Sequence, residues 1–438
     1  MDFLKARPFQ IIFIAGFILV AFLSLFIFAT FQGHGPKGAK IGTVTIWGVL
    51  PQSAISSVLS SYTASHQDYA RVSYVEKHSE TFDADLANAL ASGSGPDLVL
   101  ISQEQLATER NKLTVIPYKL ISQRTYQSSY VPEVALFQTS TGSYGIPLAV
   151  DPLVLYYNRD KLASAGAANP PATWEAITGL APTLSQHTVA DITQSAIAMG
   201  EYSNVTNARG ILSLLFLQAG STLTQAGQDG TYHSTLAQVP TGAQFTAGQS
   251  PAESALAFYT QFADPQKTVY SWNRQQPDAR QEFLAGQSAL YIGYASEEPL
   301  LAQSNPNLNF DMAPIPQPQT AATKTTFGLA YVFAIPKASK NGAGALSASM
   351  ALTVQGPAVA FAHALSMAPV LRSALNPSNS DLYQAIYYPE ALYAKGWLSP
   401  APSVTDSIFS TMITDMRSGR LSPAEAIQKA DQAIGSAI

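Results

Sequence analysis

Strands and helices alternate after residue 40, and this alternation restricts the fold more than any other feature of the chain. A compact β-branched strand at 42–48 is followed by a helical stretch at 53–65, a strand at 71–75 and a helix at 82–91. The next strand, 97–101, is apolar without alternation, which is typical of a strand covered on both faces. The order β-α-β-α-β predicts a doubly wound α/β sheet of mostly parallel strands, with ligands at their carboxyl ends.

Length and composition exclude several classes of protein. At 438 residues the chain is long enough for two or three domains, or for two lobes woven from one chain. It contains no cysteine, which excludes disulfides, cysteine-ligated metals, a thiol nucleophile and a cysteine-linked lipid. The net charge is -5 and no Lys/Arg cluster occurs, so the electrostatic footprint of a nucleic-acid binder is missing. We therefore expect no nucleic-acid partner.

An uncharged apolar run at 9–31 predicts a transmembrane helix. As a helix it would be about 34 Å long, enough to cross a hydrocarbon core. A secretory signal has a shorter apolar core and a small-residue cleavage site, so we favour an uncleaved anchor over a long signal peptide or a buried core helix. Lys5 and Arg7 keep residues 1–8 in the cytoplasm and place the rest of the chain outside. Residues 32–40 then form a short tether.

Several ordered motifs resemble a known family. The longest, 144–162 (YGIPLAVDPLVLYYNRDKL), contains a Gly-Ile-Pro strand, a crossover and a Tyr-Asn-Arg-Asp-Leu run, and 169–175 (NPPATWE) follows it as a helix start. Shorter motifs in the same order are GPDLVL at 95–100, FLAGQSALY at 283–291, MAPIP at 312–316, FGLA at 327–330 and IPKASKN at 335–341. Together they are similar to the extracellular solute-binding proteins of ATP-driven importers, in the branch that includes maltose- and oligosaccharide-binding proteins.

The resemblance implies a two-lobed periplasmic-binding-protein (clamshell) fold with doubly wound sheets, preceded here by one transmembrane helix. The residues agree, because the strand 144–148 passes into 150–156 with only Asp151 and Pro152 between them, which leaves no room for a crossover helix. A second such strand at 327–334 would make two crossings, the connections that permit lobe closure around a ligand. We expect one lobe to comprise 41–150 and 328–355, and the other 151–327 and 356–438.

Catalytic alternatives find little support in the sequence. No G-x-S-x-G elbow, P-loop, H-E-x-x-H or CxxC motif occurs, and the six histidines show no ligand spacing. The acidic pairs Glu297 with Glu298 and Asp83 with Asp85 could serve glycoside cleavage, but adjacent side chains diverge and surface acids explain them better. We expect no enzyme activity, no metal and no cofactor.

A sugar site needs flat aromatic faces and neutral or anionic hydrogen-bonding groups. The chain offers such residues at strand ends, at the crossovers and in loops that reach the cleft in the family, Asp151 at the first crossover being the strongest polar candidate and Trp47 the weakest aromatic one. The candidate ligand-binding residues are Gln52, Gln103, Asp151, Tyr202, Trp272, Tyr294, Tyr331 and Trp397.

These observations predict a membrane-anchored, extracytoplasmic binding protein that closes on a neutral solute and presents it to an ABC permease. A sugar or oligosaccharide is the first candidate. The residues after the first strand, Gly48 to Gln52, offer only Gln52 for hydrogen bonds, where many sugar binders carry charged or amide residues, so a peptide, a polyol or another neutral molecule stays open. A ligand-sensing or surface-interaction module of the same fold is the alternative.

Overall fold

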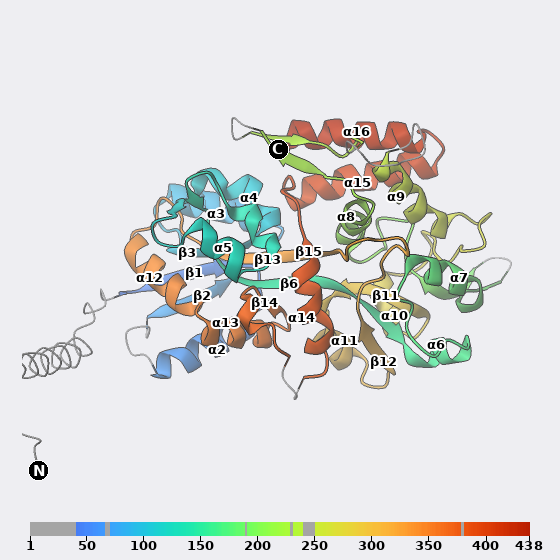
Figure 1. Ribbon diagram of the computed structural model, residues 1–438, viewed down its shortest axis with the longest axis horizontal. Coiled ribbons are helices and arrows are strands. Elements are labelled where there is room, and N and C mark those ends of the chain that lie inside the picture. The colour runs from blue at the N-terminus through green and yellow to red at the C-terminus, as the bar shows by residue number, and fades with distance from the viewer. Residues whose placement is uncertain (1–40, 66–70, 189–190, 228–230, 240–249, 378–380) are drawn as a thin grey trace, which may run out of the picture.

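The computed structural model describes residues 41–65, 71–188, 191–227, 231–239, 250–377 and 381–438 (Figure 1). The apolar run at 9–31, predicted to span a membrane, lies outside the described residues. Within the described ranges, no single helix combines the length and the hydrophobicity needed to cross a membrane.

An 11-stranded sheet runs through the molecule in the order β2-β1-β3-β13-β6-β11-β8-β7, and β12, β14 and β15 pair beside this path. We expected separate sheets in the two lobes, but the long strands β6 (Ile146–Asn158) and β13 (Thr326–Ala334) belong to both and join them. Two lobes of α/β structure therefore share one backbone framework.

The first lobe begins with three parallel strands, as the alternating sequence pattern predicts. β1 (Val44–Gly48) pairs in parallel with both β2 (Val72–Glu76) and β3 (Leu98–Ser102), whose residues are all buried. Antiparallel β13 then follows β3. The helices of this lobe are α2 (Gln52–Ser65), α3 (Phe82–Ala91), α4 (Gln103–Glu109), α5 (Gln123–Ser129), α12 (Gly342–Leu352) and α13 (Gln355–Ala364).

The second lobe is built on the far half of β6. There β6 pairs antiparallel with β11 (Ser288–Tyr294) and β12 (Phe310–Ala313), and β11 pairs in parallel with β8 (Ile192–Ile197). At the edge, β7 (Gln186–His187) pairs with β8. The helices of this lobe are α6 (Arg159–Ser164), α7 (Trp174–Leu184), α8 (Ala208–Gln218), α9 (Pro251–Thr260), α10 (Ala279–Leu284), α11 (Glu298–Ser304), α15 (Pro402–Arg417) and α16 (Pro423–Ala437).

Short strands and one helix complete the framework. β4 (Ile116–Pro117) pairs with β5 (Gly142–Ser143), and β9 (Thr224–Ala226) pairs with β10 (Tyr232–Ser234). β14 (Ala368–Pro369) joins β6, and β15 (Ala394–Lys395) joins β13. Between the last two, α14 (Gln384–Tyr393) crosses the middle of the molecule (Figure 1).

The motif at 169–175 starts a helix as expected. Thr173 is the N-cap of α7, and its Oγ1 accepts a hydrogen bond from the amide of Ala176 at 3.1 Å. This bond satisfies one of the free amides of the first helical turn.

The crossover at Asp151 differs from the prediction of two strands with a break between them. β6 continues through Asp151 and Pro152 without interruption, because Pro152 pairs with Gly328 of β13 and Asp151 pairs with Leu329. The connection between the lobes is therefore a pair of hydrogen-bonded strands, which restricts their motion to bending and twisting.

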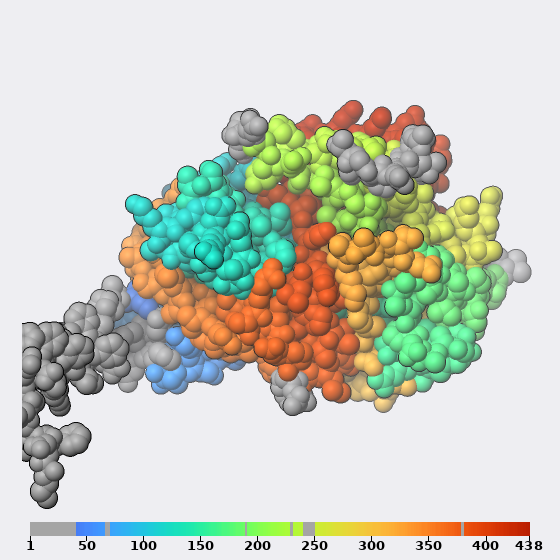
Figure 2. Space-filling model, viewed as in Figure 1, coloured from blue at the N-terminus to red at the C-terminus, as the bar shows by residue number. Residues whose placement is uncertain are grey.

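The buried side chains form two clusters, a larger one with residues from both lobes and a smaller one in the first lobe, and the smaller cluster moves one expected boundary. We expected the second lobe to resume at residue 356, but α13 packs beside α2, and its Phe361 lies in the first lobe's cluster with Ile46, Leu59 and Phe333. α13 also contacts β6 and β14, so its buried residues Ala358, Phe361 and Ala362 pack on the sheet beside α2. In the space-filling view the segments around α3 to α5, in cyan, and those around α6 and α7, in green, lie on opposite sides of the orange-red segments (Figure 2).

Candidate functional site

A cavity of about 400 Å³ lies between the two lobes. It opens at the carboxyl ends of β1 and β3, where the doubly wound topology predicts a ligand site. The first lobe and the long strand β13 contribute Val49, Ser79, Glu80, Asp83, Ser102, Glu104, Gln105, Leu329 and Tyr331, and the second lobe contributes Arg209, Ala401, Pro402, Ser403 and Asp406.

Local sequence explains how each wall presents its charged groups. Ser102 and Gln105 form a capping box at the start of α4, which fixes Glu104 in the first helical turn. On the other wall, Asn207 precedes α8 with a left-handed φ of 63°, and its side-chain Nδ2 donates to Glu297 Oε1 at 2.6 Å. This restraint places Arg209 at the start of α8, facing the first lobe.

An ion pair joins the walls directly. Arg209 of the second lobe donates to Glu104 of the first from both Nε and Nη2, each at 2.9 Å. Its Nη1 donates to Asp406 of α15 at 2.6 Å, and the Tyr202 hydroxyl donates to the other Asp406 oxygen at 2.5 Å. The side chains of Arg209 and Glu104 are only 23% and 9% exposed, so solvent screens this pair weakly.

The charges around Arg209 stabilise one another. Burial alone would lower the pKa of Arg209, but the carboxylates of Glu104 and Asp406 raise it above its ordinary value. Burial and the Asp406 carboxylate raise the pKa of Tyr202. Arg209 therefore stays cationic and Tyr202 stays a neutral donor.

A second contact between the lobes lies at the edge of the molecule. Arg110 of the short helix η2 (Arg110–Lys112) lies over the ring of Tyr232 in β10, with its guanidinium carbon 5.0 Å from the ring centroid. This cation–π contact and the Glu104–Arg209 pair both favour approach of the lobes.

Asp151 lies behind the cavity, in the crossing strand β6. It is 3% exposed and accepts hydrogen bonds from the Ser296 amide at 3.1 Å and from the Ser296 hydroxyl at 2.6 Å. Burial raises the pKa of Asp151 to about 7, although the bonds from Ser296 oppose the rise. Asp151 therefore holds the short helix η5 (Ala295–Glu297) against the crossing strand.

A second buried acid, Glu133 of η3 (Pro132–Phe137), lies beside the other crossing strand. Its Oε1 accepts from Gln103 Nε2 at 3.1 Å, and Gln103 also donates to the Gly328 carbonyl at 2.7 Å. Burial, with the nearby charges of Asp151 and Glu104, raises the pKa of Glu133 to about 8. Asp151 on β6 and Glu133 beside β13 are thus two buried acids whose pKa values are both raised.

Three of the residues predicted to bind ligand lie in the protein interior. Gln103 is fully buried, and its Oε1 accepts from the Ala330 amide at 2.8 Å, so its amide group is committed to the backbone of β13. Trp272 is fully buried and donates to Asn204. Trp397 is 5% exposed, donates to Ser213 and stacks on Phe409. None of the three is among the residues that line the cavity, and their side-chain N–H groups donate to partners within the fold.

The other four predicted residues lie in different places. Tyr331 lines the cavity, and Tyr202 contacts the lining residue Asp406. Half-buried Tyr294 lies beside α8, close to Gly210. Gln52 is exposed at the start of α2, where its amide donates to Glu76 Oε2 at 2.7 Å. Trp47 packs under Lys77, whose Nζ lies 3.8 Å from the centroid of the Trp47 ring.

Sequence reasoning missed the three charged residues that join the walls, Glu104, Arg209 and Asp406. One signal was available, because Arg209 is the only charged residue in the otherwise apolar segment of α8. A lone charge at the start of an apolar helix needs a partner nearby. Its partners come from α4 and α15, which are 105 and 197 residues away in sequence, so periodicity could not identify them.

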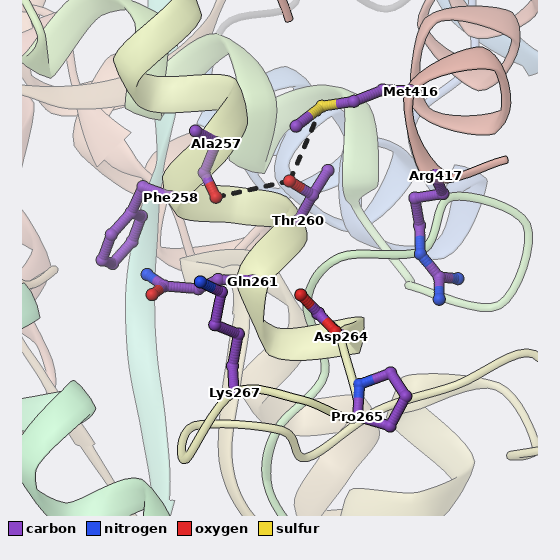
Figure 3. Close-up of a pocket in the computed structure, with 9 residues that line it drawn as sticks. All are labelled: Ala257, Phe258, Thr260, Gln261, Asp264, Pro265, Lys267, Met416 and Arg417. Carbon is purple, nitrogen blue, oxygen red and sulfur yellow. Dashed lines mark hydrogen bonds between the residues drawn. The ribbon is translucent and has the colours of Figure 1, made fainter. Parts of the chain in front are cut away.

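A larger hollow, of about 560 Å³, lies on the second lobe alone (Figure 3). α9 and α15 form its upper wall, where the Thr260 hydroxyl donates to the Ala257 carbonyl and contacts Met416 Sδ, and Asp264, Pro265 and Lys267 form its lower rim. Because all of its residues belong to one lobe, bending of β6 and β13 would leave it unchanged. The interlobe cavity is therefore the candidate site. Within the described ranges, no group of three or more His, Asp or Glu side chains is placed to hold a metal ion.

Two lobes of α/β structure, a cavity between them and paired strands that cross from one to the other are the arrangement found in proteins that close around a ligand by hinge motion. The sequence identifies the family. The model for bacterial extracellular solute-binding proteins matches residues 52–362, and the chain belongs to that family. A search of curated protein sequences gives no significant match.

Solved structures share the fold along the whole described body. The cyclic alpha-maltosyl-1,6-maltose binding protein from Arthrobacter globiformis is similar with a TM-score of 0.71 and 18% identity, over 90% of this chain and 98% of that one. An ABC transporter solute-binding protein from Thermotoga lettingae, bound with alpha-D-tagatose, has a TM-score of 0.66 and 19% identity, over 90% and 99%. The maltose/maltodextrin-binding domain from Bdellovibrio bacteriovorus, bound to maltotriose, has a TM-score of 0.66 and 14% identity, over 90% and 99%.

Proposed function

We propose that this protein captures a sugar or oligosaccharide in the interlobe cavity and delivers it to an ABC permease. The observation that carries the proposal is the cavity itself, because both lobes line it and the paired strands β6 and β13 connect them. A ligand that contacts both walls favours the closed arrangement by its differential affinity for it. The similar proteins named above, whose titles record sugars, support the choice of solute.

The lining suits hydroxyl-rich ligands. Carboxylates of Glu104, Asp406 and Asp83 accept hydrogen bonds from sugar hydroxyls, the hydroxyls of Ser102 and Ser403 donate or accept, and the Tyr331 ring supplies an apolar face. We assign Tyr331 to ligand contact, and Tyr202 to positioning of Asp406. Asp151 acts indirectly, by holding η5 against the strand that bends.

The proposal includes a membrane anchor formed by residues 9–31, with the lobes outside the cytoplasm, as the family name suggests. The test is the intact mass of the native protein together with its distribution between membrane and soluble fractions. Retention of residues 1–40 in a membrane-bound protein supports the anchor. A mature start near Gln32 contradicts it.

A thermal-shift screen against sugars, peptides and polyols tests the binding function. A solute that binds only the folded state raises the free energy of unfolding, by about 2.7 kcal/mol at a concentration of a hundred times its Kd. The unfolding temperature rises as a result. We expect shifts with sugars or oligosaccharides and none with matched peptides. A response to peptides alone would contradict the sugar assignment, and no response to any class would contradict solute capture.

A further inference from the structure

Acidic side chains outnumber basic ones among the residues that line the interlobe cavity. Four carboxyl groups line it, from Glu80, Asp83, Glu104 and Asp406, against one guanidinium, that of Arg209. Both walls contribute acids, so closure brings them together around a bound solute. Glu80 is exposed at the rim, whereas Glu104 is 7% exposed in the interior.

The single cation offers little to an anionic ligand. Arg209 donates from Nε and Nη2 to Glu104 and from Nη1 to Asp406, so carboxylates on both walls already use its three nitrogens. Two N–H groups of the guanidinium remain, but an anionic solute that accepted from them would share one cation with two carboxylates in a partly buried place. Arg209 is therefore already paired with carboxylates of both walls, and the lining holds no unpaired cation.

The Tyr331 side chain contributes no charge to the cavity. Tyr331, which lines the cavity, is 6% exposed. Burial and the charges of Asp151 and Glu104 raise the pKa of Tyr331 well above its ordinary value, and Arg209 opposes them only in part. Tyr331 therefore stays protonated and neutral, and it does not offset the carboxylates of the lining.

We propose that the cavity selects uncharged and amine-bearing solutes and rejects anionic ones, so that neutral sugars and amino sugars are ligands and uronic acids or phosphorylated sugars are not. This inference rests on the proposed function and narrows its solute class. An ammonium group on the solute can donate charge-assisted hydrogen bonds to the carboxylates of the lining. A carboxylate on the solute is repelled by them, and no unpaired cation of the lining compensates.

The test compares three forms of one sugar skeleton by calorimetry on the full-length protein. The probes are maltose, its 2-amino-2-deoxy analogue and its uronic-acid analogue, with the same three forms of cellobiose. We expect the amino form to bind at least as tightly as the neutral form, and the uronic acid to bind at least about tenfold more weakly, a difference of about 1.4 kcal/mol. Added salt should narrow the difference.

A charge-reversing variant identifies the source of selectivity. Glu80→Lys places a free cation at the rim and should reduce the ratio of neutral to uronic-acid affinity several-fold. Asp191→Asn is the control, because Asp191 is exposed just before β8, at the opposite end of that strand from the cavity. It should leave the ratio unchanged.

Three results would overturn the inference. Equal or tighter binding of the uronic acids contradicts charge selection while solute capture stands. An unchanged ratio in Glu80→Lys removes the lining acids as its cause. If none of the six compounds binds, the proposed sugar function fails and this inference fails with it.

Discussion

Glu133 is an acid with no exposed oxygen and only one described hydrogen-bond partner, the amide group of Gln103. Its pKa rises from 4.5 to about 8 in the folded protein because burial disfavours the charged form. Between these two values the folded state holds a proton that the unfolded chain has lost. The free energy of unfolding therefore falls as pH rises through this window.

Glu133→Gln removes that dependence, since an amide cannot ionise. We expect the variant to lose less stability than the wild type between about pH 5 and about pH 9, measured by chemical denaturation at both values. Glu175→Gln, at an exposed acid of α7, is the matched control and should follow the wild type. Parallel stability curves for Glu133→Gln and the wild type would show that Glu133 is charged throughout.

Individual residues also show what the sequence could and could not predict. The crossing strand that the sequence indicates at 327–334 explains why Tyr331 lies in the cavity lining. Trp272 is fully buried and outside that lining, and the sequence could not show this, because an aromatic residue in a loop has the same sequence signature whether it stacks on a ligand or fills a core. The Glu104–Arg209 pair was missed, because it depends on how two lobes meet rather than on any local pattern.

At the scale of elements, the crossing strands are packed without spare room. A Cβ on Gly328 of β13 would lie 2.8 Å from Glu133 Oε2 and 3.1 Å from Val150 Cγ2. The strand order and the helix starts follow from the sequence, since periodicity and capping are local. The continuity of β6 through Pro152 does not, because it depends on pairing with a strand 176 residues later.

We expect Gly328→Ala to destabilise the protein by about 1–3 kcal/mol, because a methyl group overpacks the crossing. Gly179→Ala is the control, since Gly179 lies within α7 with no atom within 4 Å of the added carbon. That variant should gain up to about 1 kcal/mol from helix propensity. Urea denaturation measures both, and equal stabilities for the two variants would contradict tight packing at the crossing.

For the whole molecule, the Glu104–Arg209 pair links solute capture to the position of the lobes. A hydrogen bond to a charged group contributes about 1.5–3 kcal/mol, enough to change an open-to-closed ratio by about tenfold or more. We expect Glu104→Gln to shift the lobes toward an open arrangement in the absence of solute. Asp311→Asn, which breaks the Arg159–Asp311 pair within the second lobe, should not.

The measurement uses two spin labels on a chain that has no cysteine of its own. Asn88→Cys on α3 and Ser407→Cys on α15 are exposed positions on helices that face each other across the cavity. The distance between the labels should lengthen in Glu104→Gln and stay constant in Asp311→Asn. Identical distance distributions in Glu104→Gln and the wild type would show that the pair does not hold the lobes.

The central claim, that solute binds between the lobes, is tested most directly by filling the cavity. Ser403 lines it from the exposed start of α15, whereas Thr411 is exposed further along the same helix and outside the lining. Calorimetry with a sugar found in the thermal screen should show at least about tenfold weaker binding to Ser403→Trp, because the indole takes the solute's place. Thr411→Trp should bind like the wild type. Undiminished affinity in a folded Ser403→Trp variant would place the solute elsewhere and contradict the account.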